Sequence, residues 1–187
     1  MQTTELVLKI LDTVAIIAGS TIAIIGVNAW KRQLKGRTDY ELARRYLRCV
    51  YKVRDSIRDA RNPFIPVEET VFALEKQGKD KLAVTDRNTS DRAVYSLRWE
   101  KVRTAMSDLD VELLEAEVSW GRRAKEVTNE MNLLVKKLFV TIKLFLEDRH
   151  LPPERDIIYD YGEQDSFTKS INLEIEKIES FLKPHLK

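Results

Sequence analysis

The sequence predicts an all-α protein in which one N-terminal transmembrane helix precedes an antiparallel bundle of about four helices. Residues 13–30 carry no charged side chain, and beyond residue 38 apolar residues recur at steps of three or four. No segment shows a comparable strand pattern, and 187 residues leave room for one domain beside an anchor. We therefore expect a transmembrane anchor at residues 1–30, a basic juxtamembrane linker at residues 31–37 and a cytoplasmic helical domain at residues 38–187.

The predicted anchor depends on the length of its uncharged run. Residues 13–30 are rich in Ile, Val and Ala, and as a helix they would extend about 27 Å, close to the thickness of the hydrocarbon layer. A buried helix of a water-soluble core is the alternative, but such helices rarely stay uncharged for so long. A cleaved signal peptide fits poorly, because Glu5 is the first charged residue and no basic region precedes the run.

The flanks of the run predict its orientation and its contacts with lipid. Basic residues crowd the C-terminal side, so the positive-inside rule predicts a single-pass protein of the cell membrane with a cytoplasmic C-terminal domain. Trp30 stands at the boundary, where an indole ring prefers the headgroup region. The predicted contacts with the membrane surface are Trp30, Lys31, Arg32, Lys35, Arg37, Arg44, Arg45 and Arg48.

Small residues inside the span predict self-association. Ala15, Gly19 and Ala23 recur every four residues, and Gly26 extends the same smooth stripe. A second copy could approach closely along this face, although small residues are also common in membrane helices generally. Polar residues in the span leave a pore-forming oligomer as the alternative.

The first helix after the span is strongly basic. Residues 31–61 hold eleven Lys or Arg against four Asp or Glu. Thr38 and Glu41 form a capping-box pattern, which predicts that a helix begins there and runs to about Arg61, before Asn62 and a proline. Anionic lipid headgroups are the expected partner of the basic face, a solvated surface is the alternative, and nucleic acid is unlikely because no recognition motif accompanies the basic residues.

The rest of the chain predicts further helices. We expect a short helix at residues 68–76, a loop to residue 89, and a helix capped by Ser90 or Asp91 whose apolar pattern continues to Phe145. Gly121 favours a break in that long run, and one continuous helix remains the alternative. A connector then precedes a final helix, which begins near Asp165 or Ser166 and is closed by Pro184.

No catalytic or cofactor signature accompanies these helices. Cys49 is the only cysteine and excludes an intramolecular disulfide, and its basic surroundings leave a reactive thiol as a minor alternative. A di-iron bundle needs two Glu-x-x-His pairs, and only Glu147 with His150 has that spacing. We therefore expect no enzyme, metal or cofactor. The expected function is a membrane-anchored binding or scaffolding module that assembles with copies or a partner, and an oligomeric membrane-acting toxin or effector is the alternative.

Overall fold

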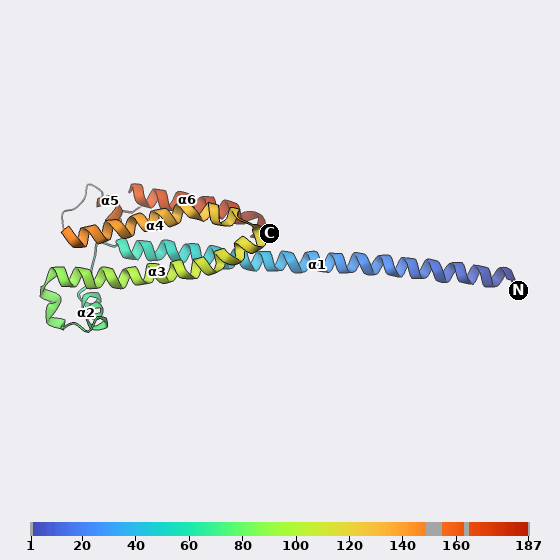
Figure 1. Ribbon diagram of the computed structural model, residues 1–187, viewed down its shortest axis with the longest axis horizontal. Helices are drawn as coiled ribbons and strands as arrows, with labels where there is room; N and C mark the ends of the chain where they lie inside the picture. The colour runs from blue at the N-terminus through green and yellow to red at the C-terminus, as the bar shows by residue number, and fades with distance from the viewer. Residues whose placement is uncertain (1, 149–154, 163–164, 187) are drawn as a thin grey trace. The chain divides into compact units, whose positions relative to one another are not determined.

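The computed structural model describes the backbone of residues 2–148, 155–162 and 165–186, and the side chains of residues 19–147, 157–162 and 165–186. All regular structure within these ranges is helical, which confirms the all-α prediction (Figure 1). The chain divides into two compact units, unit 1 (Met1–Glu41) and unit 2 (Leu42–Lys187).

Helix α1 (Gln2–Arg61) supplies residues to both units. The predicted helix start at Thr38 is wrong, and the predicted linker at residues 31–37 is helical. The hydroxyl of Thr38 donates to the carbonyl of Leu34 at 3.0 Å, the bond of a threonine inside a helix and not of an N-cap. The predicted end is confirmed, because α1 ends at Arg61, directly before Asn62 and Pro63.

Unit 2 contains the remaining helices, and most of their bounds lie close to the predicted ones. The prediction missed the short helices η1, α5 and η2. In chain order the elements are α2 (Val67–Lys76), η1 (Lys81–Thr85), α3 (Arg87–Trp120), α4 (Arg123–Asp148), α5 (Arg155–Ile158), α6 (Ser166–Leu182) and η2 (Lys183–Leu186).

Gly121 separates α3 from α4, so the predicted break is confirmed and the continuous helix is excluded. Its φ of +82° lies in the left-handed region, where glycine has no steric penalty. The N–H of Gly121 still bonds the carbonyl of Glu117 at 2.9 Å, and helical backbone resumes at Arg123. A single glycine therefore turns the chain between the two long helices.

The N-cap of α3 differs from the prediction. Asp86 is the cap, and its carboxylate accepts a hydrogen bond from the N–H of Asn88 at 3.1 Å. The hydroxyl of Ser90 instead donates to the carbonyl oxygens of Ala83 and Val84. Helix α3 thus begins about one turn before the predicted cap. Polar residues occupy that first turn, so the apolar pattern does not indicate it.

Contacts between distant side chains establish that neighbouring helices of unit 2 are antiparallel. Arg45 of α1 meets Glu112 of α3 at 3.0 Å, whereas Asp59, further along α1, lies 3.8 Å from Lys101, which is earlier in α3. The aromatic pairs Tyr95–Phe145 and Trp99–Phe139 show the same for α3 and α4, because the earlier residue of α3 contacts the later residue of α4. Helices α1, α3, α4 and α6 therefore form an antiparallel bundle, and α2 packs beside α3 (Figure 1).

One large apolar core fills the space between α1, α3, α4 and α6, and a smaller apolar cluster lies between α2 and α3. One apolar face of α6 is entirely buried. Residues 42–61 of α1 also contribute a large share, beside α3 and α4, and include Leu42, Tyr46, Val50 and Val53, which are fully buried. On the same helix Leu47 is only partly buried and Tyr40 is exposed. The buried face of α6 consists of Phe167, Ile171, Ile175, Ile178 and Leu182.

The buried guanidinium of Arg61 ties the end of α1 to the start of α6. It donates to the carbonyl oxygens of Ile157 and Tyr159, both at 2.8 Å, and to the carboxylate of Asp165 at 3.0 Å. It also donates to the hydroxyl of Thr168 at 2.7 Å. Because both charges are removed from water, these bonds offset a large desolvation cost.

A second arginine, Arg98 of α3, holds the chain between α1 and α2. Its guanidinium forms two hydrogen bonds with the carboxylate of Glu69, at 2.8 and 2.7 Å. It also donates to the carbonyl oxygens of Asn62 and Phe64. The hydrogen bond from Arg98 holds the pKa of Glu69 below its ordinary value, so the carboxylate stays ionised.

Candidate functional site

Unit 1 exposes a row of large apolar side chains on helix α1. Ile22, Ile24 and Trp30 are 70%, 63% and 65% exposed, and Ile25 and Val27 are exposed as well. Apolar side chains that leave water lower the free energy by about 25 cal/mol for each Å² that is buried. A continuous apolar helix surface of this kind is typical of a segment that another apolar phase or molecule covers.

The predicted self-association stripe lies in the same unit. Gly19, Ala23 and Gly26 are exposed, and a Cβ placed on either glycine would meet nothing within 4 Å. Ala15 lies outside the residues whose side chains are described. The helix of unit 1 therefore has space beside this stripe for the close approach of another backbone.

Among the residues whose side chains are described, no helix is long and apolar enough to cross a membrane. Residues 13–18 of the predicted span lie outside that set. The structure therefore gives no support to the span, which stays a prediction.

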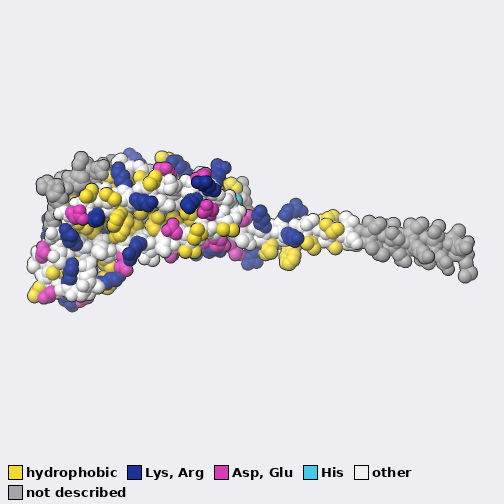
Figure 2. Space-filling view, viewed as in Figure 1, with side chains coloured by type: hydrophobic (Ala, Val, Ile, Leu, Met, Phe, Trp, Pro, Cys, Tyr) yellow, Lys and Arg dark blue, Asp and Glu magenta, His cyan; other side chains and the backbone are white. Residues whose placement is uncertain are grey.

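Exposed cations follow the apolar row directly. Lys31, Arg32 and Lys35 are exposed, and Arg37 forms an exposed ion pair with Glu41 at 3.0 Å. Figure 2 shows hydrophobic and basic side chains next to one another on the described part of unit 1. Unit 1 thus exposes an apolar surface and a basic surface that are adjacent along one helix.

Part of the predicted basic face meets protein within unit 2. The guanidinium of Arg45 lies 3.0 Å from Glu112 and 2.6 Å from Glu115, and Lys52 lies 3.3 Å from Asp108. These three carboxylates belong to an acidic run of α3, residues 108–117. Hydrogen bonds to both glutamates raise the pKa of Arg45. Arg45 thus joins two helices of the bundle, whereas Arg44 and Arg48 are exposed.

Cys49 is buried, and burial raises the pKa of its thiol. A raised thiol pKa lowers the fraction of reactive thiolate, so the alternative of an activated cysteine is wrong. Within the described residues no three His, Cys, Asp or Glu side chains stand close enough together to hold a metal ion, and His150 lies outside them. The expectation that the chain needs no metal stays a prediction.

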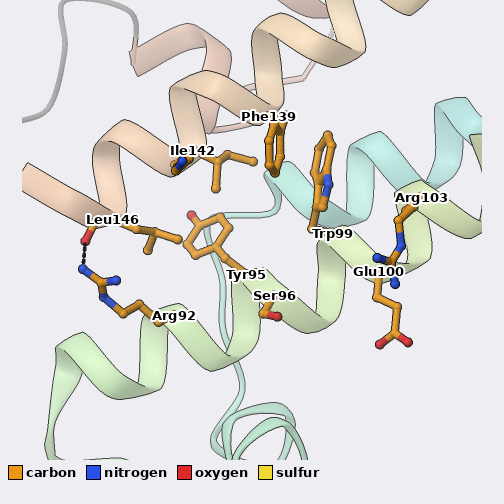
Figure 3. A pocket seen from close by; sticks show the side chains of 10 residues that line it. Arg92, Tyr95, Ser96, Trp99, Glu100, Arg103, Phe139, Ile142 and Leu146 are labelled. Carbon is orange, nitrogen blue, oxygen red and sulfur yellow. Dashed lines mark hydrogen bonds between the residues drawn. The ribbon is translucent and has the colours of Figure 1, made fainter. Parts of the chain in front are cut away.

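A groove of about 450 Å³ lies between α3 and α4, and sequence reasoning missed it. Its volume is within the range of ligand sites in proteins. Aromatic and aliphatic side chains form its floor and basic side chains its edges (Figure 3). The lining residues are Arg92, Tyr95, Ser96, Trp99, Glu100 and Arg103 of α3, and Phe139, Ile142, Lys143 and Leu146 of α4.

Contacts within the groove fix its floor. The rings of Trp99 and Phe139 contact each other at a centroid distance of 4.9 Å with their planes tilted by 32°, although Phe139 remains 43% exposed. Tyr95 contacts Phe145 edge to face, and burial raises the pKa of the Tyr95 hydroxyl well above its ordinary value. Arg92 donates to the carbonyl of Leu146 at 2.7 Å, which links the two helices at one end.

The charge of the groove is net positive. Arg92, Arg103 and Lys143 line it, and Glu100 is the one carboxylate among the lining residues. Lys76 of α2 lies 2.6 Å from Glu100 and holds the pKa of that carboxyl below its ordinary value. Glu100 is therefore paired with Lys76, Lys143 lies 4.0 Å from Glu147, and Arg92 and Arg103 leave the groove with a positive excess.

No family model, curated protein or solved structure matches this chain. The site must be interpreted from its own geometry. The described residues offer an exposed apolar and basic surface in unit 1 and an aromatic, basic groove in unit 2, and both arrangements are suited to binding.

Proposed function

We propose that the protein is a single-span, membrane-anchored binding module whose helical bundle works at the cytoplasmic face of the cell membrane. The observation that carries the proposal is the exposed apolar row of unit 1, followed directly by four exposed cations. Water is a poor solvent for such a row, and a bilayer covers it without a protein partner.

The uncharged run in the sequence supports the span. Residues 13–30 and their basic C-terminal flank satisfy the length and charge rules for a single-pass helix. The helical backbone of α1 extends through this whole run, so every backbone N–H and C=O of the run has a helical partner available. Near anionic lipid, each basic group of the flank contributes about 1 kcal/mol to the attraction.

Self-association through the small residues belongs to the same proposal. A stripe of Gly19, Ala23 and Gly26 allows two helices to approach until their backbones are in contact, which maximises dispersion forces in lipid. The module would then present two or more bundles side by side. Replacing Gly19 with Leu is expected to reduce cross-linking between copies in membranes, and Ile24→Leu is the matched control.

Deletion of residues 2–31 tests the anchor. The truncated chain keeps all of unit 2 and is expected in the soluble fraction with helical circular dichroism, whereas the full chain sediments with membranes. Replacing Lys31, Arg32, Lys35 and Arg37 with Gln is the control, because that variant keeps the apolar run and is expected to remain in the membrane fraction. Recovery of the truncated chain in membranes after a high-salt wash would rule out a single N-terminal span.

A pore-forming oligomer is the second candidate, and Asn28 favours it. This side chain is exposed on the apolar helix of unit 1, and a polar group in a membrane helix prefers a water-filled or protein-lined surface. Dye leakage from vesicles that contain the full chain, abolished by Gly19→Leu, would favour the pore. Intact vesicles with the same protein content favour the binding module.

A further inference from the structure

We infer that the groove between α3 and α4 is a docking site for an acidic amphipathic helix of a partner protein. The assignment rests on the proposed binding role of unit 2, but it does not require the membrane anchor. The shape of the groove, the spread of its charges and the exposure of its aromatic floor each point to this occupant.

The lining residues form one face on each helix. On α3 they occupy positions 92, 95, 96, 99, 100 and 103, and on α4 positions 139, 142, 143 and 146. Steps of three and four are those by which a helix faces a neighbouring helix. Two antiparallel helices with such faces side by side form the kind of valley that receives a third helix.

The positions of the cations favour an extended ligand over a small anion, which could engage only one end. Arg92 and Arg103 lie eleven residues apart on α3, which corresponds to about 16 Å along the helix axis. Figure 3 draws them at opposite ends of the lining, with the aromatic rings between them. A phosphate or a single carboxylate cannot reach both ends, whereas about three turns of helix with acidic residues on its flanks can.

The floor supplies the apolar anchor that such a helix needs. Phe139 is 43% exposed although its ring contacts Trp99, and Ile142 and Leu146 continue the floor toward Arg92. Leucine side chains at positions i, i+3 and i+7 of a partner would cover these rings and release the water above them. Because Lys76 already pairs with Glu100, no free carboxylate in the lining repels an acidic partner.

A designed peptide of about 18 residues is the probe, with Leu at helical spacing and Glu on the flanks. The full chain is reconstituted in nanodiscs of phosphatidylcholine. Failure of the chain to enter the nanodiscs would contradict the proposed anchor but not the docking site. Fluorescence anisotropy of the labelled peptide then reports binding in either case. We expect saturable binding, weakened about tenfold or more when Lys replaces every Glu of the peptide.

Paired variants locate the binding. The double variant R103E/K143E is expected to weaken binding about tenfold or more, whereas K125E/K136E, which makes the same charge change at exposed positions outside the lining, changes it less than about twofold. Phe139→Ala is expected to weaken binding about tenfold, and Val140→Ala, next to it but outside the lining, has little effect. Unchanged circular dichroism shows that each variant folds.

Three results would overturn the inference. Equal binding of the Glu and Lys peptides removes the charge argument. Equal losses of peptide binding in the two double variants, or in the two alanine variants, would show that the peptide does not bind in the groove. Vesicles of phosphatidylglycerol that bind through Arg103 and Lys143, with no binding of the acidic peptide, would assign the groove to lipid instead.

Discussion

Helix α1 contains two apolar segments with opposite surroundings. Along residues 42–61 the large apolar side chains are mostly buried, and Tyr46, Val50 and Val53 have no exposed surface. Along residues 19–41 the large apolar side chains are exposed, and Ile22 reaches 70%. The backbone conformation is helical in both. Helix formation therefore does not distinguish the two segments. The two segments differ in what covers their apolar side chains.

The composition of the two segments explains the contrast. Residues 42–61 alternate apolar and charged positions at helical spacing, so that one face enters the core of unit 2 while the other carries ions. The apolar side chains of residues 19–30 surround the helix and offer no charged face to water. The apolar face of an amphipathic helix is covered by its own domain, whereas the side chains of a helix that is apolar on every side are covered by a bilayer or by other copies.

The largest expected difference comes from a buried charge. Val50→Asp places a carboxylate in the core of unit 2 without a partner, and we expect a loss of about 4 kcal/mol or more in the free energy of unfolding. Ile24→Asp in unit 1 is expected to leave the unfolding of unit 2 unchanged and to lower the membrane-bound fraction. Chemical denaturation followed by circular dichroism, with fractionation of cells, measures both effects. Similar destabilisation of unit 2 by the two variants would contradict the contrast.

The next effect concerns ion pairs. Arg61→Met leaves the carboxylate of Asp165 buried without its guanidinium, and the expected cost is about 3 kcal/mol. Arg37→Met breaks the exposed pair with Glu41 in unit 1 and is expected to leave the unfolding transition within experimental error, because water screens such pairs. Denaturation curves of the two variants give the comparison, and equal midpoints would contradict the role of Arg61.

Acid should weaken unit 2 through Asp165. Burial raises the pKa of this carboxyl, but hydrogen bonds from Thr168 and Arg61 outweigh it and hold the pKa below its ordinary value of 3.8. A carboxyl with a lowered pKa in the folded state stabilises that state above 3.8, and this contribution is lost as the pH falls through the folded-state pKa. We expect the free energy of unfolding of Asp165→Asn to depend less on pH below about 4 than that of the unaltered chain. Parallel pH profiles of the free energy of unfolding for the two chains would show that groups other than Asp165 control the acid response.

The smallest effects have opposite signs at two glycines. Gly121→Ala places a Cβ at a φ of +82° and is expected to destabilise unit 2 by about 1 kcal/mol. Gly36→Ala lies inside the helix of unit 1 with nothing within 4 Å of the new Cβ, so it is expected to stabilise helical backbone by about 1 kcal/mol. Helix content of unit 1 in detergent and thermal unfolding of unit 2 are the measurements. A stabilising effect of Gly121→Ala would contradict the turn geometry.

Local signals in the sequence predicted much of the fold. Gly121 indicated the break between α3 and α4 because a left-handed turn favours glycine, and Asn62 with Pro63 indicated the end of α1. The prediction failed at Thr38, where a capping pattern lies inside a continuous helix. The residues before Thr38 hold no proline and continue the helix, so its hydroxyl bonds backward to Leu34.

Long-range pairing was the part that the sequence could not reveal. Arg45 and Glu112 are 67 positions apart, and nothing local indicates that a basic face and an acidic run meet. The groove was missed for a related reason, since Trp99 and Phe139 join one lining only after Gly121 turns α4 back along α3. Spacing predicts which face of a helix is apolar, but not which neighbour leaves part of that face uncovered.

The hydrogen bonds of Arg61 also constrain the order of events while the chain is synthesised. Its partners Ile157 and Asp165 follow it by 96 and 104 residues, so they leave the ribosome long after α1 is complete. Until then the guanidinium lacks these partners, although the apolar face of residues 42–61 can already pack against α3 and α4. Helix α6 is also the last long helix to be synthesised, so the buried ion pair of Arg61 with Asp165 can form only after nearly the whole chain has emerged.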